Sequence, residues 1–294
     1  MSSLSLGIYA HWRKSGAEAS LRALLHELSL HNVNALVEEQ AAKLVGQTGH
    51  SLEELYDRVD LFVALGGDGT LLRLVRDLRG KIRDLRGKMK PVMGINFGSL
   101  GFLTCFGGPE YAVAAKALAT GYYRVDERTL LEVSIERSGK TILSQIGLND
   151  VVVTRGERSR LVRLDLFIDQ THLTQYNADG LIIATSTGST AYSLSAGGPI
   201  VMPNSGVFVV TPICPHVLTN RSVIVSNKST VRLLPSRGEQ QLCVNIDGQE
   251  SMQLQESDIV TVRQAHVKLP LLFPKQLTFA DILGAKLRWS GSAI

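Results

Sequence analysis

The sequence predicts a two-domain protein, in which an α/β domain with a parallel, Rossmann-like sheet precedes an all-β, sandwich-like domain. The 294 residues, 44% of them hydrophobic, suffice for two medium-sized domains. The first third alternates short apolar runs with segments of helical periodicity, as βαβ units do. Beyond about residue 125, short β-rich segments follow one another with turn residues between them, which is typical of a sandwich.

The elements of the first domain, residues 1–125, are predicted from the spacing of apolar residues. Residues 61–65 form a short continuous apolar run, as expected of a strand buried in a parallel sheet. Leu21, Leu24 and Leu28 lie at helical spacing. On these grounds we expect strands at 4–9, 35–37, 61–65 and 91–95, and helices at 18–28, directly after residue 70 and at 110–119.

The second domain is expected to cover residues 126–269 and to consist of strands. The predicted strands lie at 130–135, 150–154, 161–168, 181–184, 207–210, 223–225, 231–234, 242–246 and 259–263. The last segment, 270–294, regains helical character between Leu271 and Leu287. We expect this segment to pack back on the first domain.

Composition argues against several classes of protein. No stretch reaches about 18 consecutive apolar residues, so no membrane span is predicted. Residues 1–10 lack the basic start and the long apolar region of a signal peptide. The three cysteines, Cys105, Cys214 and Cys243, form no CxxC pair, which argues against a zinc site or a disulfide framework. These features predict a protein of the reducing cytoplasm.

Positive charge is concentrated in one segment. The net charge is +4, but residues 73–90 alone carry eight basic and two acidic residues, which leaves −2 for the rest. This segment contains a repeat, in which Arg76 to Ile82 is followed by a near copy, Arg83 to Met89. We interpret it as a duplicated, solvated helix extension or loop. Nucleic-acid binding is not favoured, because no aromatic residues are interleaved with the charges.

The first motif with chemical meaning is Gly66-Gly67-Asp68-Gly69-Thr70, at the carboxyl end of a predicted strand. Ligands of open α/β sheets bind at that edge, and glycines let the backbone approach a ligand closely. Backbone N–H groups and a following helix N-terminus favour phosphate. Asp68 is then placed to take a proton from an attacking hydroxyl. Taken alone, the same letters also fit an ordinary turn.

The second motif runs from Asn177 to Pro199 and is rich in small hydroxyl residues, above all in Thr185-Ser-Thr-Gly-Ser-Thr190. It offers many hydrogen-bonding groups to a polar ligand. Tyr192 either stacks on a base or packs in the core; the residues alone do not separate these readings. Ser193 or Ser195 as a hydrolytic nucleophile is disfavoured, because no G-x-S-x-G elbow is present.

A third motif, Leu148-Asn149-Asp150, precedes a run of three valines. Neighbouring amide and carboxylate groups can bind sugar hydroxyls, but a turn that caps a strand has the same composition.

In their order and separations, these motifs resemble the NAD kinase family, over essentially residues 4–285. Gly66 to Gly69 is similar to its glycine-rich catalytic signature, and residues 94–103 resemble its second glycine-rich stretch. Leu148 to Asp150 resembles its Asn-Glu/Asp motif, and residues 179–199 its longest block. Asp247-Gly248-Gln249 resembles its late Asp-Gly turn. Ser186 stands where members often have proline, and the duplicated basic segment resembles an insertion.

The resemblance implies an enzyme that transfers the γ-phosphoryl group of ATP to the adenosine-ribose 2′-hydroxyl of NAD. Asp68 would be the general base, and Gly69 and Arg73 would lie against the dinucleotide or the ATP phosphates. Asn149 and Asp150 would bind adenosine hydroxyls and base. The remaining substrate contacts implied are Arg160, Asn177, Asp179, Thr190, Ala191, Tyr192, Ser193, Leu194, Ser195 and Gln249.

The resemblance also implies partners. A divalent metal ion, Mg²⁺, would arrive with ATP rather than in a dedicated protein site, and self-association as a dimer or tetramer is a family expectation. The residues do not decide between ATP and polyphosphate as donor, or between NAD and NADH as acceptor. Two rival interpretations are a lipid kinase of the diacylglycerol or sphingosine type, which shares Gly-Gly-Asp-Gly-Thr, and a dinucleotide sensor without turnover. The Thr-Gly-Ser-Thr-Ala-Tyr block argues against the first, and the retained Asp68 against the second.

Overall fold

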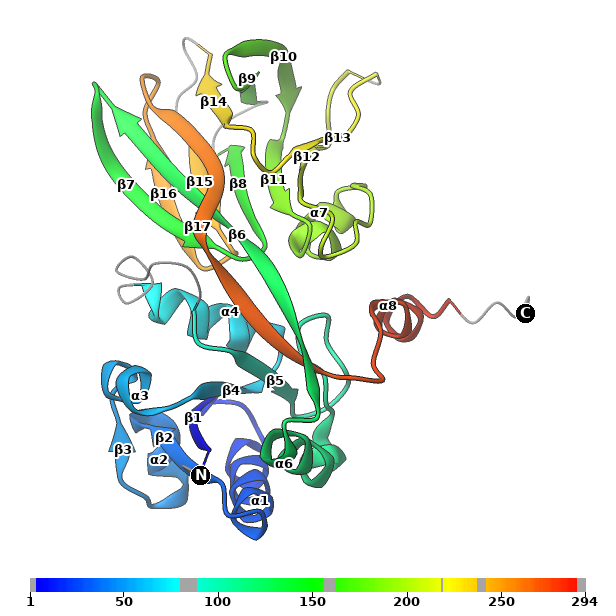
Figure 1. Cartoon of the computed structure of the whole chain (residues 1–294). Helices are drawn as coiled ribbons and strands as arrows, with labels where there is room; N and C mark the ends of the chain where they lie inside the picture. Colours follow the sequence, from blue (N-terminus) through cyan, green and yellow to red (C-terminus); the bar gives the residue numbers. More distant parts are fainter. Residues whose placement is uncertain (1–3, 80–88, 156–161, 218, 237–241, 290–294) are drawn as a thin grey trace. The chain divides into compact units, whose positions relative to one another are not determined.

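The computed structural model describes residues 4–79, 89–155, 162–217, 219–236 and 242–289. The chain divides into two compact units: unit 1 comprises Met1–Glu127 and Leu269–Ile294, and unit 2 comprises Arg128–Lys268. It passes from unit 1 to unit 2 within strand β6 (Tyr123–Arg137) and returns within β17 (Ile259–Pro274), as Figure 1 shows. The central residues of the duplicated basic segment, 80–88, and Arg160 lie outside the described residues.

Unit 1 is built on a parallel sheet of order β3-β2-β1-β4-β5-β17. The first five strands span Ser5–Ala10 (β1), Asn34–Glu38 (β2), Gly49–His50 (β3), Leu61–Gly66 (β4) and Val92–Asn96 (β5). Strand β4 is buried along its whole length, as its apolar run predicts. The order 3-2-1-4-5 of the first five strands is that of a Rossmann fold, and the strand order reverses between β1 and β4. The predicted fold class of this domain is therefore confirmed.

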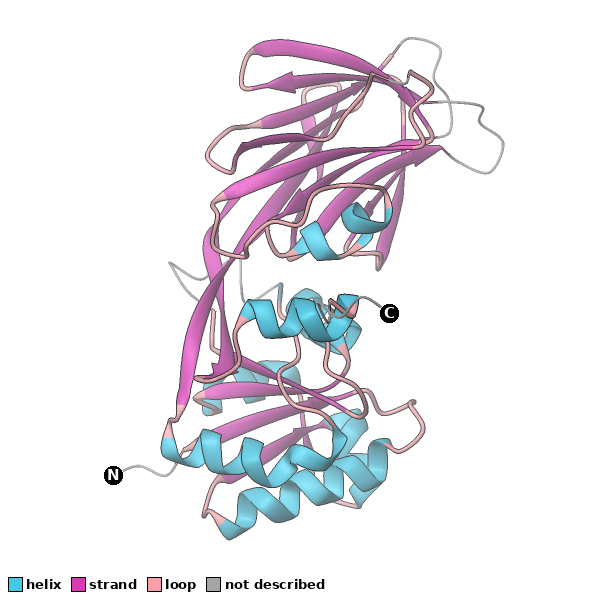
Figure 2. Cartoon of the chain, turned by 90° about the vertical axis from the view of Figure 1, so that its right-hand side faces the viewer, coloured by secondary structure: helices cyan, strands magenta, loops and turns pink. Residues whose placement is uncertain are grey.

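Helices lie next to this sheet in unit 1, as Figure 2 shows. They are α1 (Ala17–Leu30), α2 (Glu39–Val45), α3 (Leu52–Arg58), α4 (Asp68–Asp77), α6 (Tyr111–Thr120) and α8 (Phe279–Leu287), with the short 3₁₀ turn η1 (Gly108–Glu110) before α6. Helix α1 packs against α6, while α4 packs on β4. None of the helices in the described part of the chain has the length and hydropathy that a membrane span requires.

Helices α2 and α3 were not predicted, although α3 carries a local signal. Ser51 accepts a hydrogen bond from the Glu54 N–H, and the Glu54 carboxylate accepts one from the Ser51 N–H, so the two form a capping box. The prediction of a helix from Leu271 is wrong at its start. Leu271 to Phe273 end β17, where Leu271 pairs with Val92, and the helix begins only at Phe279. An apolar run buried on both sides fits a strand as well as a helix, and pairing with β5 decides between them.

Unit 2 consists of two sheets. The first is antiparallel, with the order β13-β12-β11-β8-β15-β16, and the second contains β10, β9, β14 and β17, with β6 paired to β17 and to β7. The strands not yet delimited are β7 (Lys140–Gly147), β8 (Asp150–Arg155), β9 (Val162–Ile168), β10 (Thr171–Ala178), β11 (Gly180–Thr185), β12 (Val207–Ile213), β13 (Val223–Ser226), β14 (Val231–Pro235), β15 (Leu242–Ile246) and β16 (Glu250–Leu254). Strands β7, β10 and β16 were not predicted, because polar residues interrupt their apolar pattern.

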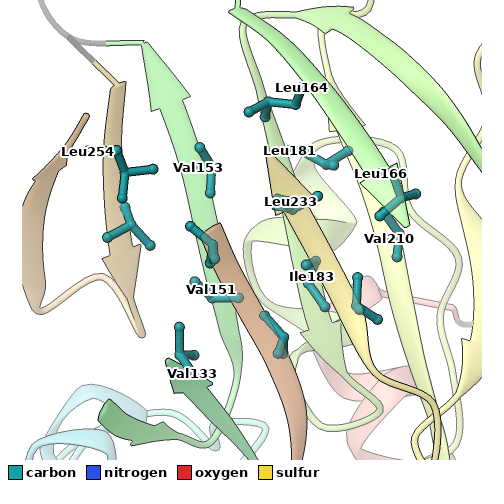
Figure 3. Close-up of a cluster of buried hydrophobic side chains, with 14 of the residues drawn as sticks. Val133, Val151, Val153, Leu164, Leu166, Leu181, Ile183, Val210, Leu233 and Leu254 are labelled. Carbon is teal, nitrogen blue, oxygen red and sulfur yellow. The ribbon is translucent and has the colours of Figure 1, made fainter. Parts of the chain in front are cut away.

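The two sheets enclose one hydrophobic core, which Figure 3 shows in close-up. Alternate residues of each strand point into it, such as Val151 and Val153 of β8 and Leu164 and Leu166 of β9. This period of two is what a sheet buried on one face requires. The sandwich-like prediction is therefore confirmed.

The outer face of the six-stranded sheet is also partly covered. Val152, Ile182 and Val209 point away from the main core and form a second cluster with Val201, with Ala196 packed against it. The segment between β11 and β12, which contains η2 (Gly188–Thr190) and α7 (Tyr192–Ser195), therefore lies on this outer face. It is the hydroxyl-rich motif of the sequence.

The β9–β10 hairpin permits a matched test of the core. Leu164 is fully buried, whereas Leu173 in the same hairpin is 47% exposed. We expect Leu164→Ala to lower the free energy of unfolding by about 2–5 kcal/mol, because it leaves a cavity among packed side chains. The same change at Leu173 should cost less than about 1 kcal/mol. Urea unfolding followed by circular dichroism measures both, and equal losses would contradict this description of the core.

Candidate active site

In unit 1, the glycine-rich motif lies where the order of the parallel sheet reverses. Strands β1 and β4 are neighbours, and their carboxyl ends lie side by side, with the His11 N–H donating to the Leu65 carbonyl at 3.0 Å. Gly66 ends β4, and Asp68 begins α4. Ligands of such sheets bind outside the strand ends at this reversal, and a helix N-terminus there favours an anion.

The Asp68 side chain is held by backbone of the second glycine-rich stretch. Its Oδ2 accepts a hydrogen bond from the Phe102 N–H at 2.8 Å, and its Oδ1 accepts one from the Leu103 N–H at 3.1 Å. No local pattern indicates this contact, because the partners are main-chain groups more than 30 residues away. The carboxylate is half-buried, with one donor on each oxygen.

Two further predicted residues lie on α4. Gly69 is exposed, in the first turn of the helix. Arg73 lies one turn further along, with its Nε 3.6 Å from Asp77 Oδ2. Asp77 also accepts a hydrogen bond from the Tyr9 hydroxyl at 2.7 Å and pairs with Arg76 at 2.8 Å. In this structure the guanidinium of Arg73 is therefore ion-paired with a carboxylate of its own helix.

Unit 2 holds a cavity of about 410 Å³ on the outer side of the six-stranded sheet. Its walls come from β8, β15, the turn after β15 and the hydroxyl-rich segment. It is lined by Asn149, Asp150, Val152, Thr154, Ala191, Tyr192, Asn245, Asp247 and Gly248. Four of these were predicted as ligand contacts: Asn149, Asp150, Ala191 and Tyr192. A concave site with a few converging polar groups is the usual form of a small-molecule site.

Asp247 shapes one side of this cavity. It begins the turn between β15 and β16, where Asp247 and Gly248 both have positive φ (51° and 65°) and the Gln249 N–H donates to the Ile246 carbonyl. This is the Asp-Gly type of hairpin turn. The Asp247 carboxylate accepts hydrogen bonds from three successive N–H groups, those of Leu148 and Asn149 at 2.7 Å and that of Asp150 at 3.1 Å.

Asp150 lies beside this carboxylate and is almost entirely buried. Burial, and secondarily the negative charge of Asp247, raise the pKa of Asp150 to about 7. Burial also raises the pKa of Asp247, but its three N–H donors oppose that rise. Because those donors favour the charged form of Asp247, Asp150 is the member of the pair that holds a proton near neutral pH.

Most hydroxyls of the Thr185–Thr190 segment are engaged inside the protein. Thr185 Oγ1 donates to the Leu148 carbonyl at 2.6 Å and accepts from the Gly188 N–H at 3.0 Å. Ser189 bonds both the Ser186 and the Val201 carbonyls, and Ser186 bonds the Val207 carbonyl. A Cβ on Gly188 would lie 2.0 Å from the Asn149 carbonyl oxygen, so only glycine permits this approach. The segment therefore fixes the position of Asn149.

Tyr192 lines the cavity and is 46% exposed. Of the two readings that the sequence left open, packing in the core is therefore wrong. Thr190, directly before Ala191, donates from its hydroxyl to the Thr187 carbonyl at 3.2 Å.

The other predicted contacts of unit 2 that the structure describes do not line this cavity. Ser193 is fully buried, with its hydroxyl 2.9 Å from that of Thr211, and Leu194 and Ser195 follow it in α7. Asp179 Oδ1 is 3.5 Å from Arg155 Nε, and the carbonyl of Asn177 accepts from the His216 N–H. Gln249 lies in the β15–β16 turn, with its Oε1 buried and without a hydrogen bond.

Sequence reasoning missed three polar residues of the cavity wall. Asp247 belongs to the motif Asp247-Gly248-Gln249, from which only Gln249 is predicted as a contact, and Thr154 and Asn245 belong to no predicted site. The period of two provides a signal for both, since each alternates with residues that point into the core, Val153 and Val244. The Oδ1 atom of Asn245 is buried without a hydrogen-bond partner.

No group of three His, Cys, Asp or Glu suited to a metal ion occurs among the described residues.

Family comparisons agree with this architecture. Residues 7–124 match the family model described as ATP-NAD kinase N-terminal domain, and residues 148–272 match the one described as ATP-NAD kinase C-terminal domain. The two models together describe a two-domain kinase, and they match most of the chain.

Individual relatives give the same result. The NAD kinase of Geobacter metallireducens is 38% identical over 286 residues, which cover 97% of this chain and 98% of the relative. The NAD kinase of Solibacter usitatus is 37% identical over 284 residues, 96% of each chain. A crystal structure of yeast NADH kinase complexed with NADH superposes with a TM-score of 0.83 at 27% identity, covering 99% of this chain and 89% of that one.

An NAD kinase from Archaeoglobus fulgidus in complex with ATP shares the fold, with a TM-score of 0.74 at 23% identity over 97% of this chain and 99% of that one. The fold and the two glycine-bearing motifs thus define a two-domain kinase. This chain belongs to the ATP-NAD kinase family, and the resemblance seen in the sequence is confirmed.

The raised pKa of Asp150 predicts a pH-dependent stability. The folded state holds this proton more tightly than the unfolded state, whose Asp pKa is near 3.8. The stability from protonation is therefore full below about pH 4 and is lost as the pH rises through 7. Asp150→Asn removes the titration, so we expect it to be more stable than the wild type at pH 8 by up to about 4 kcal/mol, and by much less at pH 5.

Denaturant unfolding of both proteins at the two pH values measures this difference. Asp57→Asn, an exposed carboxyl on α3, serves as the control for net charge. A stability difference between Asp150→Asn and the wild type that is the same at pH 5 and pH 8 would contradict the assignment of the proton to Asp150.

Proposed function

We propose that this chain transfers the γ-phosphoryl group of ATP to the 2′-hydroxyl of the adenosine ribose of NAD, with Asp68 as general base. The observation that carries this proposal is the position of Asp68. It lies at the carboxyl end of β4 where the sheet order reverses, within the motif Gly-Gly-Asp-Gly-Thr, in a chain of the ATP-NAD kinase family.

The reaction needs a base, a place for phosphates and little else from the protein. Asp68 takes the proton of the 2′-hydroxyl as the hydroxyl oxygen attacks the γ-phosphorus of ATP. The bond between that phosphorus and the β,γ-bridging oxygen breaks, and ADP leaves with the electron pair, so that NADP and ADP are the products. The N-terminus of α4, with Gly69, and the Arg73 side chain favour the phosphate charge. Mg²⁺ enters as part of the substrate MgATP.

In unit 2, the 410 Å³ cavity is proposed to hold part of the dinucleotide. Asn149 and Asp150 would contact adenosine hydroxyls and base, and the Tyr192 ring would stack on an aromatic base. Residues 190–195 would contribute further contacts to NAD, as would Asn177, Asp179 and Gln249, together with Arg160.

A cytoplasmic location is proposed as well, in line with three cysteines that are all free thiols in the structure. The homo-oligomer, a dimer or tetramer, is proposed from the family alone. Sedimentation velocity decides its size, and a strictly monomeric active enzyme would contradict it.

The reaction is tested by NADP formation from NAD, ATP and Mg²⁺, with an NADP-specific dehydrogenase as reporter. We expect Asp68→Asn to lower kcat by about 10²–10⁴-fold, because it removes the proton acceptor. Calorimetric NAD binding should be largely retained. Parallel assays with polyphosphate as donor and NADH as acceptor define the substrates. Folded wild-type protein that makes neither NADP nor NADPH would overturn the proposal, and lipid acceptors would be assayed next.

The stacking role of Tyr192 is tested with a matched pair. Tyr192→Ala removes the ring and should raise the KM for NAD by tenfold or more, since stacking of a base on an aromatic side chain is worth about 1–3 kcal/mol. Tyr192→Phe keeps the ring and should change the KM by less than about threefold. Steady-state kinetics measure both variants. An equal rise of KM in both would assign the effect to the hydroxyl group instead.

A further inference from the structure

The turn formed by residues 101–104 lies against the Asp68 carboxylate. It donates two successive N–H groups, from Phe102 to Oδ2 and from Leu103 to Oδ1. Because each oxygen receives one donor, rotation about the last side-chain bond would break both hydrogen bonds. The plane of the carboxylate is therefore fixed, although the side chain is only half-buried.

This turn can approach Asp68 only because residue 101 has no side chain. A Cβ on Gly101 would lie 2.0 Å from Asp68 Oδ1, 2.7 Å from its Cγ and 2.5 Å from Thr104 Oγ1. All three distances are shorter than the 3.0 Å below which Cβ atoms essentially never approach other heavy atoms. A side chain at this position has to displace either the carboxylate or the turn.

Thr104 holds the turn in shape, and β5 holds the segment that follows. Thr104 is fully buried, and its Oγ1 accepts a hydrogen bond from the Gly101 N–H at 2.8 Å. After it, the Cys105 N–H donates to the Gly94 carbonyl, and the Asn96 N–H donates to the Phe106 carbonyl. The two donors to Asp68 are thus attached to the parallel sheet itself.

We propose that Gly101 and Thr104 are positioning residues for the phosphoryl transfer, acting through the orientation of Asp68. This inference rests on the proposed function, in which Asp68 is the base. A carboxylate oxygen can accept two hydrogen bonds, so each Asp68 oxygen keeps one free acceptor site for the incoming hydroxyl. The turn removes the rotational freedom that Asp68 would otherwise lose in the transition state.

The first test is Gly101→Ala, assayed for kcat and for the KM of NAD. A displacement of about 1 Å of a reacting group can cost about 10²-fold in rate. We expect kcat to fall by about 10²-fold while the KM for NAD changes by less than about threefold, since the ligand contacts proposed in unit 2 are untouched. Gly284→Ala in α8, where an added Cβ meets no atom within 4 Å, is the matched control and should keep wild-type kinetics.

The second test covers the case in which Gly101→Ala does not fold. Thr104→Val keeps the side-chain shape but removes the acceptor of the Gly101 N–H, and Thr104→Ser restores that acceptor. We expect kcat to fall by about tenfold in Thr104→Val, since a buried N–H left without its acceptor destabilises the turn. Thr104→Ser should recover kcat to within about threefold. A structural role alone would lower the melting temperature without this selective loss and rescue of kcat.

The outcomes separate the two proposals. Wild-type protein without NADP formation, or an Asp68→Asn variant with full activity, would refute the proposed function or the base. If Asp68→Asn is inactive but folded Gly101→Ala, or Thr104→Val in its place, has wild-type kcat, only the positioning role is refuted. A fall in kcat matched by an equal rise in the KM for NAD also refutes it, because the turn would then act in binding.

Discussion

Three hydrogen bonds to one carboxylate organise the candidate site of unit 2. Asp247 accepts the N–H groups of Leu148, Asn149 and Asp150 and so ties the β15–β16 turn to the start of β8. The peptide groups that it holds position Asn149 and Asp150 at the cavity wall. Burial is the main cause of the raised pKa of Asp150, and the negative charge of Asp247 adds to it, so this side chain contributes to both the geometry and the electrostatics of the cavity.

Unit 1 holds its own carboxylate, Asp68, in the same way, through backbone N–H groups. The N–H groups of Phe102 and Leu103 orient Asp68 from outside its own helix. In each unit a glycine makes the close approach possible, Gly101 against Asp68 and Gly188 against Asn149. Glycine-rich stretches that could be taken for phosphate loops therefore also serve to bring backbone close to polar groups of the protein itself, a side chain at Gly101 and a main-chain carbonyl at Gly188.

Hydroxyl-rich composition was a weaker guide to ligand contacts than it first suggests. In the Thr185–Thr190 segment, the hydroxyl groups of Thr185, Ser186 and Ser189 donate hydrogen bonds to backbone carbonyls of the protein. Buried polar groups must find partners, and the nearest partners here are the carbonyls of neighbouring strands. The longer segment between β11 and β12 packs on the outer face of the sheet, and it contributes Ala191 and Tyr192 to the cavity wall.

The sequence by itself determined the two-domain plan, most strand positions and the motifs that identify the family, because periodicity and glycine-rich turns are local signals. It also singled out Asp68, Asn149 and Asp150. Tertiary structure alone decided that Leu271 to Phe273 form a strand, that Tyr192 lies at a cavity, and that Thr154, Asn245 and Asp247 share its wall. These outcomes depend on main-chain and side-chain contacts between residues about 100 positions apart, such as Asp247 with Leu148, and no local pattern encodes which distant N–H group a carboxylate will meet.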